Sequence, residues 1–300
     1  MKKSSKEMFE RNYRAFGREG QAKISKLKVA LIGCGGLGWQ IAQQLIGVGV
    51  RTLLLIDSDI LEITNLNRLP GASFSKVGSP KAMVLSHLLK RMNPNAAVKY
   101  MIASVPDSRV MKRLKQYDVI MGGVDSERAR SELNRFSVTH LKYYLDGGSG
   151  ILLEDGNVKH AGGQVNVVIP GISPCLACNH TLDWKMMLYE SLDKAEQEIE
   201  VKRGYIQGVS EPAPSVVSIN GIVASTLVTE FIKLATGLKE PNFYTYFDSM
   251  ATDNLMFKVD VQKNDDCVIC SREALFGYGD IVKEDKKVSD LPSFISERVL

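Results

Sequence analysis

The segment KVALIGCGGLG at residues 28–38 restricts the fold more than any other part of the chain. An apolar run leads into Gly33, Gly35 and Gly38, which have G-x-G-x-x-G spacing, and apolar residues then recur every four positions. A buried strand, a glycine turn and a helix in this order are typical of a nucleotide-binding unit, because N–H groups at the helix start bind phosphate. The pattern does not distinguish ATP from NAD, and a tight turn without a ligand also satisfies it.

Strands and helices continue to alternate through the first half of the chain. A buried strand at 51–57 ends in Asp57, where an acid can accept hydrogen bonds from ribose hydroxyls. Further strands are expected at 98–103 and 117–123. Helices are expected at about 107–115, from Ser126, and from Ser79-Pro80, with Ser79 as the N-cap and Pro80 in the first turn. This alternation predicts parallel βαβ units with right-handed crossovers.

In the second half of the chain, the regular alternation of strands and helices ends. Antiparallel strands are expected within residues 159–171, 243–248 and 254–260, with a long helix from Pro214 to Thr236 closed by Gly237. We therefore predict an α/β fold: a Rossmann-like, mostly parallel sheet with helices on both faces, continued by antiparallel strands. The expected divisions are an N-terminal arginine-bearing segment, a nucleotide-binding half, a substrate-binding and zinc half, and a C-terminal tail, at 1–27, 28–148, 149–270 and 271–300. Residues 179–214 form either a helical crossing segment or a loop over a site.

Composition excludes several classes of protein. The 300 residues are 44% hydrophobic and carry a formal charge of +4, which fits one globular unit. The basic residues are scattered, which argues against nucleic acid as the main partner. Residues 1–14 have a basic start without an apolar stretch behind it, and we find no run of eighteen apolar residues, so we expect a cytoplasmic protein without a membrane span.

Three charged residues follow two of the predicted parallel strands. Arg68 and Lys81 lie in the connection after the second strand, and Asp125 follows the strand at 117–123. Parallel sheets gather ligands at the carboxyl ends of their strands. Cations there suit a polyphosphate, and a carboxylate suits magnesium, which usually takes one or two carboxylates and phosphate oxygens. Solvated surface charges, and for Asp125 a helix N-cap, are the alternatives.

Four of the five cysteines form two C-x-x-C pairs, Cys175/Cys178 and Cys267/Cys270. Four thiolates match a closed, tetrahedral structural zinc site, which leaves no position for catalysis. Redox pairs or unligated cysteines are the alternatives. Cys34, inside the glycine loop, is expected to be a packing residue, and the four histidines show no ligand spacing.

The motifs described above follow one another in the order found in a known family. From about Arg11 to Cys270, the chain resembles the ThiF/MoeB/HesA-type adenylyltransferases, bacterial relatives of the ubiquitin-activating enzymes. The resemblance implies that Gly36 and its neighbours pack against ATP and that Asp57 binds the ribose. It also implies phosphate contacts from Asn65 and Arg68, charge compensation by Lys81, and magnesium bound by Asp125, with Ser126 beside it in the nucleotide site. Arg14, with Arg11 nearby, resembles an arginine that reaches the γ-phosphate of the partner subunit, which implies a homodimer.

The implied reaction is attack of a carboxylate on the α-phosphorus of ATP, which gives an acyl-adenylate and pyrophosphate. The implied substrate is the Gly-Gly terminus of a ubiquitin-like or sulfur-carrier protein, with a conjugating enzyme or sulfur donor as a further partner. We expect no thioester on this chain, because residues 179–214 contain no cysteine. The alternatives are adenylation of a ribosomal peptide or a tRNA-borne carboxylate, an NAD-dependent dehydrogenase, and an inactive subunit of a heterodimer.

Overall fold

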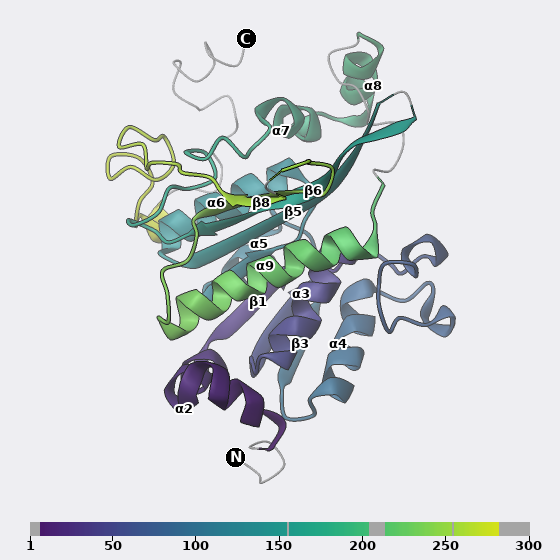
Figure 1. The fold of residues 1–300 in the computed structure, drawn as a ribbon. Helices are drawn as coiled ribbons and strands as arrows, with labels where there is room; N and C mark the ends of the chain where they lie inside the picture. The colour runs from purple at the N-terminus through teal and green to yellow at the C-terminus, as the bar shows by residue number, and fades with distance from the viewer. Residues whose placement is uncertain (1–6, 155, 204–213, 254, 282–300) are drawn as a thin grey trace.

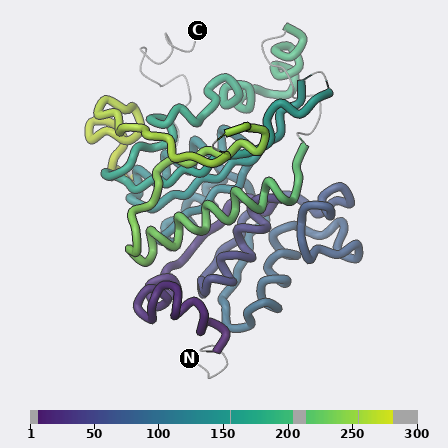
Figure 2. Tube along the Cα trace, in the orientation of Figure 1, coloured from purple at the N-terminus to yellow at the C-terminus, as the bar shows by residue number. Residues whose placement is uncertain are grey.

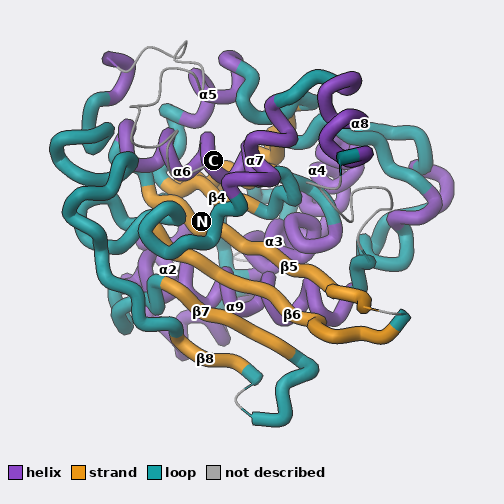
Figure 3. The backbone as a smooth tube through the Cα atoms, turned by 90° about the horizontal axis from the view of Figure 1, so that it is seen from above, coloured by secondary structure: helices purple, strands orange, loops and turns teal. Residues whose placement is uncertain are grey.

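A single eight-stranded sheet forms the centre of the molecule (Figure 1). The computed structural model describes residues 7–154, 156–203, 214–253 and 255–281. The strands follow the order β3-β2-β1-β4-β5-β6-β7-β8. The first five are parallel and the last three are antiparallel to their neighbours, as Figure 3 shows for β5 to β8 lying side by side. The predicted fold class is confirmed.

The parallel strands are short, and all except the edge strand β3 are largely buried on both faces. They are β1 (Lys28–Ile32), β2 (Thr52–Ile56), β3 (Ala97–Met101), β4 (Val119–Gly122) and the beginning of β5 (Tyr143–Glu154). In β1, Val29 and Leu31 pack into one hydrophobic cluster, whereas Ala30 and Ile32 pack into another on the opposite face. This division follows from the two-residue period of a strand, and it explains why both faces of the sheet require helices.

Helices cover both faces. On one face lie α3 (Gly36–Gly47), α4 (Lys81–Met92) and α9 (Val217–Thr236), with α2 (Glu10–Lys26) at their edge. On the other lie α5 (Ser108–Leu114) and α6 (Glu127–His140), beside the cysteine pairs. The order β3-β2-β1-β4 reverses direction between β1 and β4, which is where open α/β sheets bind ligands.

The antiparallel half consists of β5, β6 (Asn157–Val168), β7 (Tyr244–Asp248) and β8 (Met256–Lys258). Because β5 pairs with both β4 and β6, the sheet is continuous across residue 148. Among the described helices, α9 alone is long and apolar enough to cross a membrane by length and composition. Here it lies along the sheet, with Val223, Leu227 and Phe231 in the core, and Gly237 ends it in a left-handed conformation as predicted.

One predicted helix start is wrong. The N-cap of α4 is Pro80, and no side chain caps this helix, so Ser79 is not its N-cap and Pro80 is not in its first turn. The backbone is extended there because Pro80 forms an isolated bridge with Ile60 and the Ser79 carbonyl accepts a hydrogen bond from Leu61 N–H. Lys81 therefore opens the helix.

Two of the connections contain helices of their own. The connection between β2 and α4 contains the short helices η1 (Ile63–Asn65) and η2 (Phe74–Lys76) and projects away from the sheet (Figure 2). The crossing segment is helical in its described part, with α7 (Trp184–Ser191) and α8 (Lys194–Lys202). Residues 204–213, and 282–300 of the predicted tail, lie outside the described residues. The described end of the tail is the short helix η3 (Gly279–Ile281).

Candidate active site

The glycine loop lies between the carboxyl ends of β1 and β4. Gly33 has a left-handed φ of 89°, and a β-carbon there would overlap the Gly123 carbonyl. A β-carbon at Gly38 would overlap the carbonyl oxygen of Gly33. Both glycines are therefore required by backbone packing, because no side chain fits.

Gly35 and Gly36 form the start of α3. Gly35 is the N-cap, no side chain caps the helix, and nothing lies within 4 Å of the position that its β-carbon would occupy. The first N–H groups of α3 thus have no side-chain cap, which leaves them available to bind phosphate. At Gly36 a β-carbon would overlap Nδ2 of Asn220 and lie 3.2 Å from Cδ of Arg68. Side chains from α9 and from the turn that follows η1 therefore border the helix start.

Asp57 holds the glycine loop in place. Its Oδ2 accepts a hydrogen bond of 2.5 Å from the N–H of Cys34, and its Oδ1 accepts one of 2.7 Å from the N–H of Asp59. Burial raises the pKa of the Asp57 carboxyl above its usual value, although these two backbone hydrogen bonds oppose the shift. Each oxygen retains a lone pair for a ribose hydroxyl. Burial also raises the pKa of the Cys34 thiol, which fits a packing residue rather than a nucleophile.

The predicted cations lie at the same edge. Nη1 of Arg68 donates to the carbonyl of Thr64 at 2.6 Å, while the stem of this side chain lies over Gly36. Asn65 is buried, and its side-chain oxygen accepts from Glu62 N–H in a capping box, so the amide shapes the turn that carries Arg68. Nζ of Lys81 lies 2.8 Å from Oδ2 of Asp59, and the lysine side chain is only 13% exposed.

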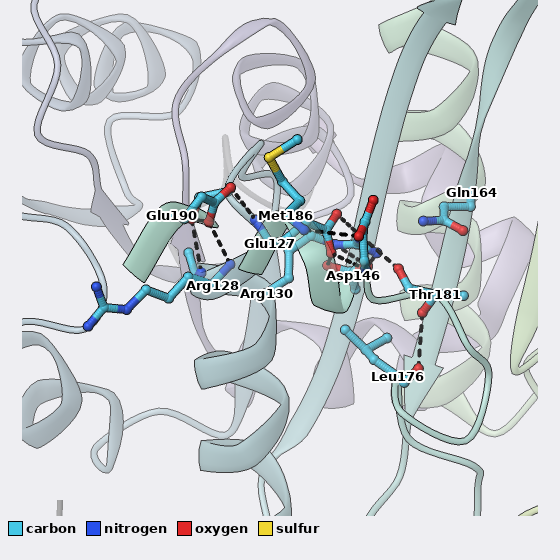
Figure 4. Close-up of polar contacts among 12 residues, drawn as sticks. Glu127, Arg128, Arg130, Asp146, Gln164, Leu176, Thr181, Met186 and Glu190 are labelled. Carbon is cyan, nitrogen blue, oxygen red and sulfur yellow. Dashed lines mark hydrogen bonds and ion pairs between the residues drawn. The ribbon is translucent and has the colours of Figure 1, made fainter. Parts of the chain in front are cut away.

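Asp125 and Ser126 begin the connection from β4 to α6. Asp125 is exposed, and its carboxylate forms no hydrogen bond or ion pair with the described residues. Ser126 is the N-cap of α6, and its hydroxyl accepts from Ala129 N–H, so the capping role belongs to Ser126 and leaves the Asp125 carboxylate available for a cation. Around them, Glu190 from α7 contacts the first turn of α6 (Figure 4).

Arg14 does not join this site within its own chain. It lies on α2, is 78% exposed, and has Glu10 as its ion partner at 3.5 Å. The same helix contacts the far end of α3, where Asn12 donates to the carbonyl of Gly47. Because α3 has 12 residues, about 18 Å of helix separates that end from the glycine loop. Figure 1 shows α2 at the amino end of β1, opposite the glycine loop.

The four paired cysteines come together behind α6. Their sulfur atoms all lie within 4.8 Å of one another, with Cys175–Cys267 at 3.7 Å and Cys178–Cys270 at 3.5 Å. Tetrahedral zinc with bonds of about 2.3 Å requires sulfur separations of about 3.8 Å. The buried thiols therefore fit a structural zinc ion that joins the segment after β6 to the segment after β8.

Comparison with known proteins gives the family. A profile of the ThiF family matches residues 9–269, which is most of the chain. The chain belongs to the ThiF family. The predicted resemblance is confirmed, and the range contains the motifs described above except Cys270, which lies one residue beyond it.

Several relatives of this ThiF-family chain are adenylyltransferases or activating enzymes by name. It is 26% identical to the molybdopterin-synthase adenylyltransferase of Escherichia coli K12, over 86% of this chain and 93% of that protein. It is 25% identical to the NEDD8-activating enzyme E1 catalytic subunit of Schizosaccharomyces pombe, over 81% and 69%. For the Xenopus laevis adenylyltransferase and sulfurtransferase MOCS3, 27% identity covers 85% of this chain but only about half, 51%, of the relative.

Solved structures share the fold. The Microcin C7 biosynthetic enzyme MccB, in complex with N-formylated MccA, has a TM-score of 0.73 with 20% identity, over 88% of this chain and 75% of that chain. PaaA has a TM-score of 0.65 with 19% identity, over 88% and 84%.

Sequence patterns in this ThiF-family chain missed several residues around the site, Glu190 among them. Asn220 borders Gly36 from the distant helix α9, and Asp59 pairs with Lys81. Arg130 and Asp146 form a buried ion pair with Nη2 and Oδ2 2.6 Å apart. Asp59 had a detectable signal, because it follows the same strand as Asp57, whereas the other contacts depend on packing between elements far apart in sequence.

Proposed function

We propose that this chain activates the C-terminal carboxylate of a ubiquitin-like or sulfur-carrier protein as an acyl-adenylate. The enzyme class is that of an ATP-dependent adenylyltransferase, which we infer from the match to the ThiF family and from the names of the relatives. The observation that carries the proposal is the uncapped start of α3, where Gly35 leaves open space at the edge that also holds Asp57, Arg68, Lys81 and Asp125. A nucleotide with its phosphates at the helix start fits this arrangement.

Each residue at this edge has a distinct proposed role. The N–H groups of α3 and the guanidinium of Arg68 hold phosphate oxygens, and Asp57 holds the ribose. Lys81, kept in place by Asp59, offsets charge near the α-phosphate and the departing pyrophosphate. Asp125 would hold magnesium, which supplies further compensation of phosphate charge. A carboxylate oxygen of the substrate attacks the α-phosphorus, so catalysis depends on positioning and charge rather than on a protein nucleophile.

The proposed assembly is a homodimer in which Arg14 serves the partner subunit. Its position at the far end of α3 supports this, since the side chain is exposed and remote from the site of its own chain. We further propose a structural zinc ion bound by Cys175, Cys178, Cys267 and Cys270, and a cytoplasmic location. A sulfur donor or conjugating enzyme would then take the activated acyl group.

A ribosomal peptide is the second candidate substrate. The shared fold with MccB, which has been solved with N-formylated MccA, supports the chemistry but shows only the fold at 20% identity. A small carboxylate on tRNA requires a basic surface that the net charge of +4 does not favour. We do not retain the dehydrogenase, because the family match points to adenylation and NAD leaves Arg68 and Lys81 without a role.

The test is ATP–pyrophosphate exchange by the purified protein with magnesium, against Gly-Gly-terminated carrier proteins and peptides encoded near its gene. We expect exchange that depends on one carrier and disappears when its last glycine is deleted. Asp125→Ala should lower exchange about a hundredfold or more while the melting temperature stays unchanged, because the side chain is exposed. Exchange with a peptide instead would favour the second candidate. Full activity of Asp125→Ala would remove Asp125 from the metal role.

A further inference from the structure

Glu190 joins the crossing segment to the start of α6. Its Oε2 accepts hydrogen bonds from the Ser126 hydroxyl at 2.7 Å and from Arg128 N–H at 2.8 Å, and its Oε1 accepts from Glu127 N–H at 3.1 Å. Figure 4 shows this carboxylate reaching the first turn of α6 from α7. One side chain thus satisfies the free N–H groups of a helix start, where a negative charge is also favoured by the helix dipole.

Two more contacts hold the same segment against α6. Oε2 of Glu127 accepts from Asp183 N–H at 3.0 Å, and Nη1 of Arg130 donates to the carbonyl of Thr181 at 3.0 Å. Arg130 is itself fixed by the buried carboxylate of Asp146. The α6 side of the contact is therefore rigid.

The α7 side is held differently. Neither α7 nor α8 contains a fully buried residue, and of their side chains only the half-buried Trp184 of α7 packs against the hydrophobic core within the described residues. Elements of this kind open at low free energy when their polar contacts are removed. The Glu190 contacts therefore act together with the packing of Trp184 and hold the carboxyl end of α7 against α6.

We propose that Glu190 is a positioning residue that couples closure of α7 to the placement of Asp125. Asp125 directly precedes the Ser126 N-cap, so its backbone direction depends on how the first turn of α6 is held. With Glu190 in place, the N-cap and the two following N–H groups are fixed and the Asp125 carboxylate is presented to the cation. When α7 moves away, the turn loosens and magnesium binding weakens. This inference rests on the proposed role of Asp125.

The test compares Glu190→Ala and Glu190→Gln with Glu198→Ala. Glu198 is a matched control because it lies on α8 in the same segment, is exposed, and forms no ion pair with the described residues. In ATP–pyrophosphate exchange, Glu190→Ala should raise the magnesium concentration for half-maximal rate about fivefold or more. Glu190→Gln should be intermediate, because it keeps one acceptor oxygen but loses the charge. Nucleotide binding in magnesium-free buffer should not change in any of the three variants.

Amide hydrogen exchange gives a second measurement that does not depend on activity. Glu190→Ala should speed exchange in residues 127–130 and 184–191, whereas Glu198→Ala should not. Faster exchange without a change in magnesium dependence would reduce Glu190 to a structural contact and overturn the proposal. The proposal would also be overturned if both Glu190 variants had the magnesium dependence and the amide hydrogen exchange of the wild type. If the wild-type protein catalysed no reaction, the proposed function would fail, whereas an active wild type with unaffected Glu190 variants would reject this inference alone.

Discussion

Oδ2 of Asp57 accepts a 2.5 Å hydrogen bond from the N–H of Cys34, so the acid at the end of β2 holds the glycine loop at the end of β1. The two strands are neighbours in the sheet, with Ile32 paired to Ile56, and the residues that follow them are adjacent for that reason. The carboxylate thus has a structural contact in addition to its proposed contact with ribose.

This arrangement predicts a pH dependence of nucleotide binding. Burial raises the pKa of the Asp57 carboxyl above 3.8, so its protonation begins at a higher pH than for an exposed aspartate. The ionised form accepts the hydrogen bonds, and nucleotide affinity should therefore fall as the pH is lowered through this raised pKa. Titration calorimetry with ATP measures this loss.

Asp57→Asn should bind nucleotide more weakly at neutral pH, and its affinity should not fall further as the pH is lowered. Asp118→Asn is the control, since Asp118 also accepts a backbone hydrogen bond, from Lys28 N–H, but at the amino end of the sheet. If the affinity of Asp57→Asn for nucleotide still fell at acidic pH as in the wild type, another group would be responsible for the pH dependence.

The contribution of the Asp57 carboxyl to folding stability depends on pH in the opposite direction to nucleotide binding. A carboxyl with a raised folded-state pKa binds its proton more readily in the folded state than in the unfolded state. Its contribution to stability is present at low pH and is lost as the pH rises from 3.8 through the folded-state pKa. Loss of nucleotide at acidic pH would thus not arise from unfolding caused by Asp57.

A second prediction separates binding from folding in the glycine loop. Gly35→Ala should leave the melting temperature unchanged, because nothing lies within 4 Å of the new methyl group. It should weaken ATP binding about tenfold or more, since the methyl group occupies the proposed phosphate position. Gly47→Ala, at the other end of α3 and also in open space, should bind ATP normally and match or exceed wild-type stability. Equal ATP affinity in both variants would place the phosphates elsewhere.

A third prediction concerns the exposed Arg14. Arg14→Ala and Lys81→Ala should each be inactive, whereas an equimolar mixture that exchanges subunits should regain about one quarter of the wild-type activity. Half of the dimers are then hybrids, and each hybrid has one site with both residues. Mass-resolved dimer analysis is the control for exchange. No recovery after confirmed exchange would contradict action in the partner subunit.

A fourth prediction concerns the cysteine cluster. The isolated protein should contain one zinc ion per chain, measured by atomic emission, and removal with a strong chelator should lower its melting temperature by about 5 °C or more. Cys267→Ser should have this lower melting temperature already and should not respond further to the chelator. A chelator effect of equal size in the variant would show that the metal binds elsewhere.

Local patterns in the sequence predicted the strand–turn–helix unit at Gly33 to Gly38, the cluster of four cysteines and the end of α9 at Gly237, because each depends on near neighbours or on residue type. They did not predict β5, whose central glycines at 147–148 hide its strand pattern. The contacts of Asn220 with Gly36 and of Glu190 with Ser126 escaped prediction for another reason. Each joins elements whose relative position depends on the packing of the whole sheet.

The most direct test of the central claim uses the carrier or peptide that supports exchange, labelled with oxygen-18 in its C-terminal carboxylate. Attack by a carboxylate oxygen on the α-phosphorus forms a bridging bond, and later loss of the acyl group breaks the carbon–oxygen bond. We therefore predict that the released AMP contains one labelled oxygen, detected by mass spectrometry, and that pyrophosphate contains none. Unlabelled AMP, or formation of ADP and labelled phosphate, would contradict adenylation of a carboxylate.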